Sequence, residues 1–476
     1  MSTLSLKVKN FINQDIFFLI FISIIISILI ILGNDYFPLV YAIGFLLAVA
    51  VVRLILKNPK FGLYLLIFNL PINLYIPFFN FGGDKFSISV NEVLLFLLLI
   101  SLLLKKIYSG NLTFPNSRLN RPIFLLIGFN AISLLLAISD LTQIQYLRCW
   151  LYFFLWVEYF LVYFLILDLV HTDKEIKFII SLLLVSGAIT VFSAIYQQII
   201  GSELKSIGVV TETGKTYYRL ATPFGFYSNH FGAYLLIILS ILFHYYFSNK
   251  RKLIYFLLII PTFYTLFYTF SRSSFLGLIS LVIVLFITRR EQRKKIVIIS
   301  LTFLLVSLMI FTPVFLRWSK KAGVMKSGRL IVEHNIRERF SQWEASLSEF
   351  IKHPLIGKGF YTYRFRQINY SSHFGFVKYI DHPDNVIVKL LIESGIFGFI
   401  TFIILIFKIY SSVHNFLRSK TSNDLRLISY IVLTSLTCFL ITSMFETMFT
   451  AGRVTGPLFV LIGLVVVRAR IESFKI

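Results

Sequence analysis

The sequence predicts an all-α protein: a polytopic bundle of about fourteen transmembrane helices with cytoplasmic termini and one large extracytoplasmic loop. Three observations support this fold class. Hydrophobic residues occupy 57% of the 476 positions, more than soluble domains usually carry. Apolar runs of about 20 residues, long enough to cross a hydrocarbon core of about 30 Å, recur along the chain. One long polar segment, residues 316–384, interrupts these runs.

The expected spans follow one another closely, so we treat residues 1–476 as a single integral membrane domain. The first apolar run is expected to be a retained span, because no small-residue cleavage site follows it as in a signal peptide. The expected spans are residues 16–32, 37–56, 61–79, 90–104, 122–139, 146–170, 176–200, 224–247, 253–270, 273–288, 296–315, 386–410, 427–447 and 454–467.

The basic residues predict the orientation of these spans. A formal net charge of +24 is also typical of proteins that bind nucleic acids. Here, however, Lys and Arg gather in short loops on one side of the spans. That distribution is the positive-inside pattern of a membrane protein, so we expect no nucleic-acid partner. Alternation of the spans then puts both termini in the cytoplasm. The long loop, residues 201–223 and the turn at residues 271–273 face the opposite side.

The long loop is expected to be folded. Residues 337–352 place Phe340, Trp343 and Leu347 at helical spacing with charges between them, which predicts an amphipathic helix at the membrane interface. The following His353-Pro354 should end that helix. The loop histidines have no metal-ligand spacing, and the two cysteines lie in or beside apolar spans. We therefore expect no metal site.

Three outward-facing places are candidates for chemistry. Arg219 precedes the eighth span, and Arg272 lies in the turn between the ninth and tenth. Two guanidinium groups can hold a diphosphate through charge-assisted hydrogen bonds; the alternative is that each arginine only reaches the membrane interface. The third place is the loop end, where His382 or Asp384 can act as a base. Asp384 or Asn385 can also simply cap the next helix.

At this point the residues resemble a known family. Four motifs occur in order on the predicted outer side, and each is similar to an element of the O-antigen ligases and related O-antigen polymerases. They are Arg219 with the run PFGFYSNHFG at 223–232, TFSRSS at 269–274, HPLIGKG at 353–359, and Asp384-Asn385 followed after nine residues by Gly395 and then Gly398. The last motif departs from the family pattern, which begins with histidine where this chain has Asp384.

The resemblance implies a reaction. This family transfers a glycan from a polyprenyl diphosphate carrier to an acceptor on the periplasmic face of the bacterial inner membrane. The acceptor is lipid A–core for a ligase and another lipid-linked repeat unit for a polymerase. Arg219 and Arg272 would bind the diphosphate, and His382 or Asp384 would activate the acceptor hydroxyl, supported by Asn385 and Gly395. No cofactor is implied.

Other assignments remain open from the residues. Arg339 is an outward cation that can attract an anionic donor, or a solvated loop charge. The departure at Asp384 weakens a ligase relative to a polymerase. A transporter such as a lipid-oligosaccharide flippase would need a polar central cavity with charges at mid-span, whereas most spans here are cleanly apolar. A scaffolding membrane protein would leave the arginine motifs unexplained.

Overall fold

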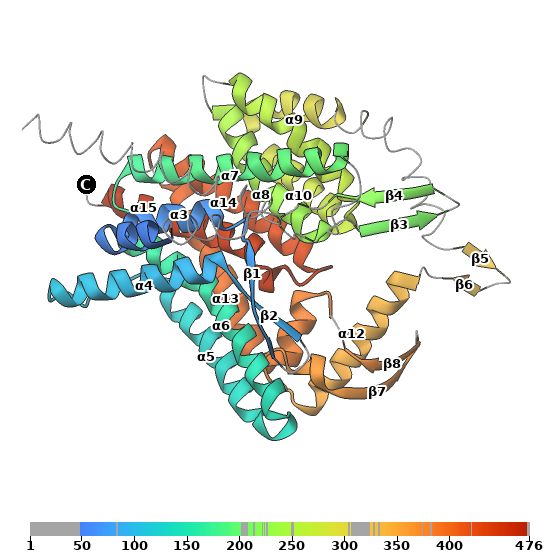
Figure 1. Cartoon of the computed structure of the whole chain (residues 1–476). Coiled ribbons are helices and arrows are strands. Elements are labelled where there is room, and N and C mark those ends of the chain that lie inside the picture. Colours follow the sequence, from blue (N-terminus) through green and yellow to red (C-terminus); the bar gives the residue numbers. More distant parts are fainter. Residues whose placement is uncertain are drawn as a thin grey trace, which may run out of the picture.

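The computed structural model is mostly helical (Figure 1). It describes residues 48–81, 84–200, 208–212, 215–220, 222, 224, 227–248, 252–302, 305, 324–326, 329–331, 334–373, 375–380, 383–419 and 421–473. The expected span 16–32, most of the span 37–56 and the outer half of the span 296–315 lie outside these residues.

The N-terminal described part corrects one expected span. Helix α3, Pro59–Asn69, has only 11 residues, and at 1.5 Å per residue it covers about half of a hydrocarbon core. After a turn in which Asn73 has φ of 27°, strands β1, Tyr75–Phe81, and β2, Asp84–Ser89, form an antiparallel hairpin. The predicted span 61–79 is therefore wrong in its second half. Asn69, Pro71 and Asn73 interrupt an apolar run that hydropathy alone reads as continuous.

Most of the other expected spans within the described residues appear as helices. Ser89 begins α4 with a capping box, since its hydroxyl and the Glu92 carboxylate each bond the other residue's backbone N–H. Thr142 and Gln145 begin α6 in the same way. The helices are α4, Val90–Tyr108; α5, Asn120–Leu136; α6, Gln143–Leu169; α7, Asp173–Ile200; α8, Ser228–Ser248; α9, Lys252–Tyr268; α10, Arg272–Thr288; α13, Val386–Arg418; α14, Asn423–Ser443; and α15, Gly452–Ser473.

Within the described residues, six helices are long and apolar enough to cross a membrane. A seventh is reached if α10 and the segment Arg290–Thr302, bent by 109° against it, count as one span. Helices α8 and α15 lie deepest, with 83% and 78% of their most apolar windows buried inside the protein. This arrangement supports a multi-pass membrane protein, while the total of fourteen spans stays a prediction.

The long loop has its own folded core, as expected. Helix α12, His334–Lys352, covers the predicted amphipathic stretch and packs on α13. Strands β7, Gln367–Ser372, and β8, Gly375–Tyr379, form an antiparallel hairpin beside α12. A small apolar cluster joins them to α13: Ala345, Tyr363, Val377, Ile380 and Ile392. Two further hairpins are β3, Gly208–Glu212, with β4, Lys215–Arg219, and β5, Val324–Lys326, with β6, Arg329–Ile331.

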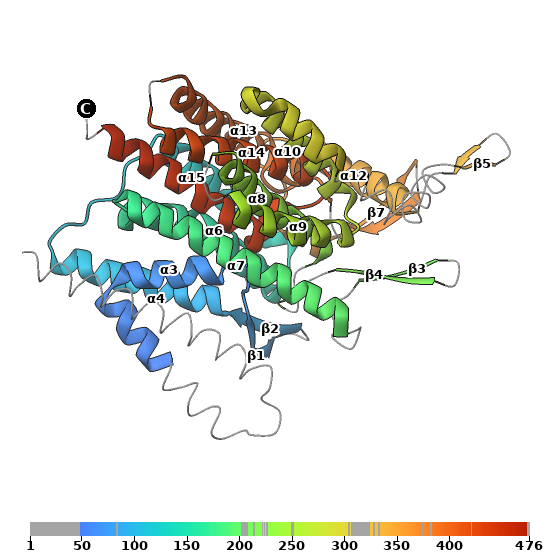
Figure 2. The same ribbon diagram turned by 90° about the horizontal axis from the view of Figure 1, so that it is seen from above.

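The loops expected in the cytoplasm meet at one end of the bundle. Lys106 pairs with Asp168 at 2.9 Å, and Arg468 pairs with Asp173 at 2.7 Å. Figures 1 and 2 both show α12 and the β3–β4, β5–β6 and β7–β8 hairpins at the end opposite the C terminus. The hairpins of the expected outer side thus lie together at one end of the described structure, and the membrane topology stays a prediction. Which end faces the cytoplasm stays a prediction.

Candidate active site

The end of the long loop leads directly into α13. Asn385 caps this helix, because its Oδ1 accepts hydrogen bonds from the backbone N–H groups of Ile387 at 2.8 Å and Val388 at 3.2 Å. Its Nδ2 donates to the backbone oxygen of Met444 at 3.1 Å. The capping role considered for this residue is therefore confirmed, and the cap also ties α13 to the turn after α14. His382 lies outside the described residues.

Asp384 belongs to a charged cluster that is centred on Arg339. It has φ of 46°, a left-handed conformation that Asp and Asn tolerate better than most residues. Its Oδ2 lies 3.6 Å from Nη2 of Arg339 on α12, and the same nitrogen lies 2.8 Å from Oε1 of Glu446. Nη1 of Arg339 donates to the backbone oxygen of Phe445 at 2.6 Å. One guanidinium thus bridges two carboxylates from different parts of the chain.

The start of α8 joins the same cluster. Nδ2 of Asn229, within the first of the four outward motifs, donates to the Glu446 carboxylate. Three residues later, a Cβ on Gly232 would lie 2.2 Å from Oγ of Ser274 on α10. Only glycine permits this close approach of α8 and α10. Residues 228–232 of the first motif and the motif at 269–274 are therefore packed together beside the loop end.

The two predicted phosphate-binding arginines, Arg219 and Arg272, lie on neighbouring parts of the backbone. The backbone of Arg219 ends β4, and the N–H of the next residue, Leu220, donates to the oxygen of Tyr268 at 2.8 Å. Tyr268 is the last residue of α9, four positions before Arg272. Arg272 is the first residue of α10 and its side chain is exposed. The chain near Arg219 thus runs beside the turn that carries Arg272.

The environment of Asp384 changes its acidity. Burial raises the pKa of its carboxyl from 3.8 to about 7, and the negative charges of Glu446 and Glu338 act in the same direction. The positive charges of Arg339 and Lys389 oppose that rise. A carboxyl with a pKa near 7 is close to half ionised at neutral pH. It can therefore accept a proton from a hydroxyl group and release it again.

The glycine-containing motifs of the loop and of α13 fit against each other. Helix α13 is broken at Gly395, whose φ is 65° and ψ is −164°. The segment 353–359 crosses this break: the N–H of Lys358 donates to the oxygen of Ile392 at 2.8 Å, and that of Gly359 donates to Glu393 at 3.0 Å. A Cβ on Gly357 would lie 2.6 Å from the Glu393 backbone, which requires glycine there. This contact holds the loop above the first turns of α13.

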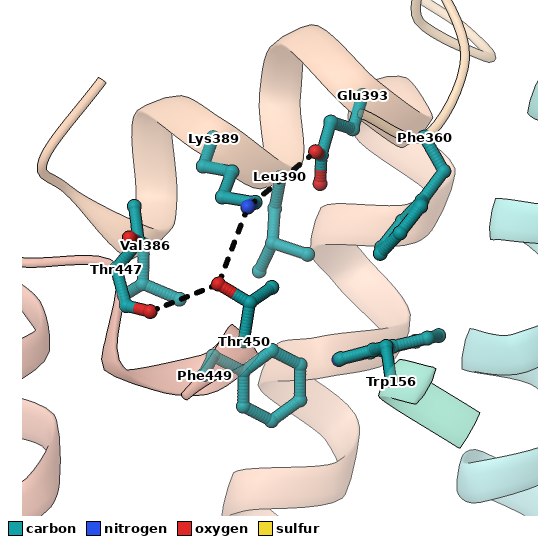
Figure 3. Close-up of a pocket in the computed structure, with 9 residues that line it drawn as sticks. All are labelled: Trp156, Phe360, Val386, Lys389, Leu390, Glu393, Thr447, Phe449 and Thr450. Atoms are coloured by element: carbon teal, nitrogen blue, oxygen red, sulfur yellow. Dashed lines mark hydrogen bonds and ion pairs between the residues drawn. The ribbon is translucent and has the colours of Figure 1, made fainter. Parts of the chain in front are cut away.

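A buried ion pair lies one turn below Asp384. Nζ of Lys389 lies 3.6 Å from Oε1 of Glu393 and 3.4 Å from the hydroxyl of Thr450. Figure 3 shows the amino group pointing between these two oxygens, above the rings of Phe449 and Trp156 that line a small pocket. Glu393 also accepts the N–H of Tyr361 at 2.9 Å. The pair therefore links α13 to the loop and to the turn before α15.

Reasoning from the sequence missed Glu446 as a site residue. It was included at the end of the expected span 427–447, whereas α14 ends at Ser443 and Glu446 lies in the following turn, 9% exposed. A lone carboxylate at the end of an apolar span is the signal that could have identified it. Arg339, expected as a supporting cation that can attract an anionic donor, is the residue that joins Glu446 to Asp384.

Comparison with known families agrees with the predicted resemblance. Residues 256–403 match the family model described as O-Antigen ligase. This segment contains Arg272, Arg339, Asp384 and Gly395 but not Arg219. No curated protein sequence matches the chain. The match confirms the resemblance to O-antigen ligases over this segment and indicates a glycosyltransferase type of membrane protein.

Proposed function

We propose that this protein transfers a glycan from a polyprenyl diphosphate carrier to the hydroxyl group of an acceptor sugar. Its residues 256–403, which match the O-antigen ligase family model, support this proposal. The observation that carries the proposal is the partly buried Asp384 carboxyl, with a pKa of about 7, at the start of α13. It lies within reach of the cation Arg339 and beside motifs that bear Arg219 and Arg272. The expected place is the periplasmic face of a bacterial inner membrane.

In the proposed reaction the acceptor hydroxyl attacks the anomeric carbon of the donor sugar. Asp384 takes the hydroxyl proton as the new C–O bond forms. The bond from the anomeric carbon to the diphosphate oxygen breaks, and the diphosphate leaves on its lipid. Arg219 and Arg272 stabilise the negative charge that develops on this leaving group. A single displacement inverts the configuration at the anomeric carbon.

The proposal assigns Asp384 rather than His382 as the base. Asp384 has a defined environment that raises its pKa into the working range, and Arg339 holds its carboxylate. Asn385 orients the adjoining turn as a helix cap. Gly395 and the segment 353–359 position the loop, so their proposed role is structural support of the site. The acceptor, lipid A–core or a second lipid-linked repeat unit, distinguishes a ligase from a polymerase.

Replacement of the chromosomal gene by an Asp384→Asn variant tests the function. Asn tolerates the left-handed backbone and removes only the charge. We expect surface glycan to be lost while the lipid-linked donor accumulates on the outer face, where a membrane-impermeant oxidant such as periodate modifies it. Accumulation of long chains indicates a ligase, and accumulation of single repeat units indicates a polymerase.

A matched variant, Glu291→Gln, changes an exposed carboxylate at the other end of the bundle and should leave the glycan unchanged. Normal surface glycan in the Asp384→Asn strain, at an equal protein level, would contradict the proposed role. Donor that accumulates only on the inner face, protected from periodate, would instead identify a flippase.

A further inference from the structure

An open pocket lies at the end of the bundle opposite the candidate active site. Its cavity of about 690 Å³ opens between the segment before α5 and the last turns of α13. Three of its lining residues carry a positive charge: Arg118, Arg121 and Lys408. Side chains with hydroxyl or amide groups also line it: Asn116, Ser117, Asn120, Ser411, Ser412 and Asn415. The pocket therefore has a cationic and hydrogen-bonding lining.

In the described part of the chain, these three cations lack the carboxylate partners that two other cations at this end have. Lys106 and Arg468 at the same end pair with carboxylates at 2.9 and 2.7 Å. No ion pair or hydrogen bond involves the side chain of Arg118, Arg121 or Lys408 within the residues that the structure describes. Three cations around one cavity, none with a carboxylate partner among the described residues, favour an anion there.

Asn120 provides a second, independent feature of the same pocket. This residue lines the cavity and is 9% exposed. Its Nδ2 donates to the oxygen of Pro115 at 2.8 Å, but its buried Oδ1 has no hydrogen-bond donor. A buried carbonyl oxygen without a partner is costly. A ligand that carries both an anionic group and a hydroxyl would satisfy the cations and this oxygen together.

The surface beside the pocket is apolar. Phe407 lines the pocket rim and is 70% exposed. Ile403 and Ile400, one and two turns earlier on the same face of α13, are 46% and 45% exposed. They continue an apolar strip from the pocket toward the middle of the helix. A free phosphate ion would not contact these apolar side chains, whereas the acyl chain of a lipid would cover them.

We propose that the pocket binds the headgroup of an anionic phospholipid that also carries hydroxyl groups, with an acyl chain along the α13 strip. The phosphate contacts Arg118, Arg121 and Lys408, and a headgroup hydroxyl donates to Oδ1 of Asn120. Basic pockets between transmembrane helices are a recognised setting for anionic lipid headgroups. This site is separate from the candidate active site, and its occupancy does not depend on the proposed glycosyl transfer.

Native mass spectrometry of the purified, delipidated full-length protein tests this site. Phosphatidylglycerol is titrated against the unchanged protein and against the triple variant Arg118→Gln, Arg121→Gln, Lys408→Gln. A cation near an anionic headgroup contributes about fivefold in affinity, so we expect the triple variant to bind at least about tenfold more weakly. Phosphatidylcholine, which has no net charge, should bind the unchanged protein no better than it binds the variant.

A matched triple variant, Arg290→Gln, Lys294→Gln and Lys295→Gln, removes the same charge from exposed residues elsewhere at this end. It should bind phosphatidylglycerol normally. Equal binding by the pocket variant, equal binding of phosphatidylcholine, or displacement of the lipid by inorganic phosphate would each overturn the proposal. If the triple variant does not elute as a folded protein, Arg118→Gln alone, in an exposed loop, should still weaken phosphatidylglycerol binding.

Discussion

Neutralising Asp384 should stabilise the protein above neutral pH. Its carboxyl has a pKa raised from 3.8 to about 7, chiefly by burial, so the folded protein binds this proton more tightly than the unfolded chain does. The stability contributed by this proton is present below pH 4 and is lost as the pH rises from about 4 to about 7. Asp384→Asn removes the titration, and Asn accepts the φ of 46°.

The size of the effect follows from the pKa change. At 1.36 kcal/mol per pKa unit, a rise from 3.8 to about 7 corresponds to about 4 kcal/mol across the whole window. Between pH 5 and pH 8 the wild-type protein should lose about 3 kcal/mol relative to Asp384→Asn. The pKa of about 7 already includes the opposing effect of the Arg339 charge, 3.6 Å from the Asp384 carboxylate.

Thermal unfolding in detergent, followed by tryptophan fluorescence at pH 5 to 8.5, measures this difference. The unfolding midpoint of Asp384→Asn should move above that of the wild type as the pH increases, with the two closest at pH 5. Glu291→Gln, which changes an exposed carboxylate far from the cluster, should follow the wild type at every pH. Parallel curves for wild type and Asp384→Asn would refute the reasoning.

Three further perturbations probe the site. Gly395→Ala places a side chain at φ of 65° and 2.4 Å from the Leu355 carbonyl carbon, so it should destabilise by at least about 2 kcal/mol. A Cβ at Gly128 would have no atom of the described residues within 4 Å, so Gly128→Ala should stabilise the protein by up to about 1 kcal/mol. Equal unfolding midpoints for these two variants would contradict the close contact between Gly395 and the Leu355 backbone. Lys389→Met leaves a buried carboxylate unpaired and should cost about 3 to 5 kcal/mol, and Glu393→Gln in the same chain should restore part of it; no recovery in the double variant counts against the pair. Arg339→Gln removes the cation that lowers the pKa of the neighbouring carboxyl, so glycan transfer in isolated membranes should need a pH higher by about one unit; an unchanged or lowered pH profile would exclude that role.

Local patterns in the sequence predicted much of the helical framework. The expected spans agree with α6, α7, α8 and α14 within four residues at each end, and α15 continues six residues beyond its expected end at residue 467. Apolar length and capping residues such as Thr142 act over a few neighbouring positions, so they can be read directly along the chain. The amphipathic helix α12 was predicted for the same reason, since its period is local.

The expected span 61–79 shows where such reasoning fails. Apolar residues occur along the whole of this segment. Nevertheless α3 ends at Asn69, and the chain turns into the β1–β2 hairpin. Backbone hydrogen bonds of that hairpin come from a partner strand, and hydropathy contains no information on pairing. Turn-forming residues such as Pro71 and Asn73 carried the relevant signal and were outweighed by the apolar count.

By itself the sequence determined the membrane class from its composition and the family resemblance from the order of its motifs. It also marked Asp384, Asn385 and Arg272 as candidate site residues. Only the tertiary structure decided that Arg339 bridges Asp384 to Glu446, two residues that belong to different segments. Arg339 and Glu446 are separated by 107 positions, and Gly357 approaches Glu393 across the break in α13. Such contacts depend on how helices pack, and burial and charge at Asp384 arise from that packing. The raised pKa that makes Asp384 a candidate base is therefore a property of the fold.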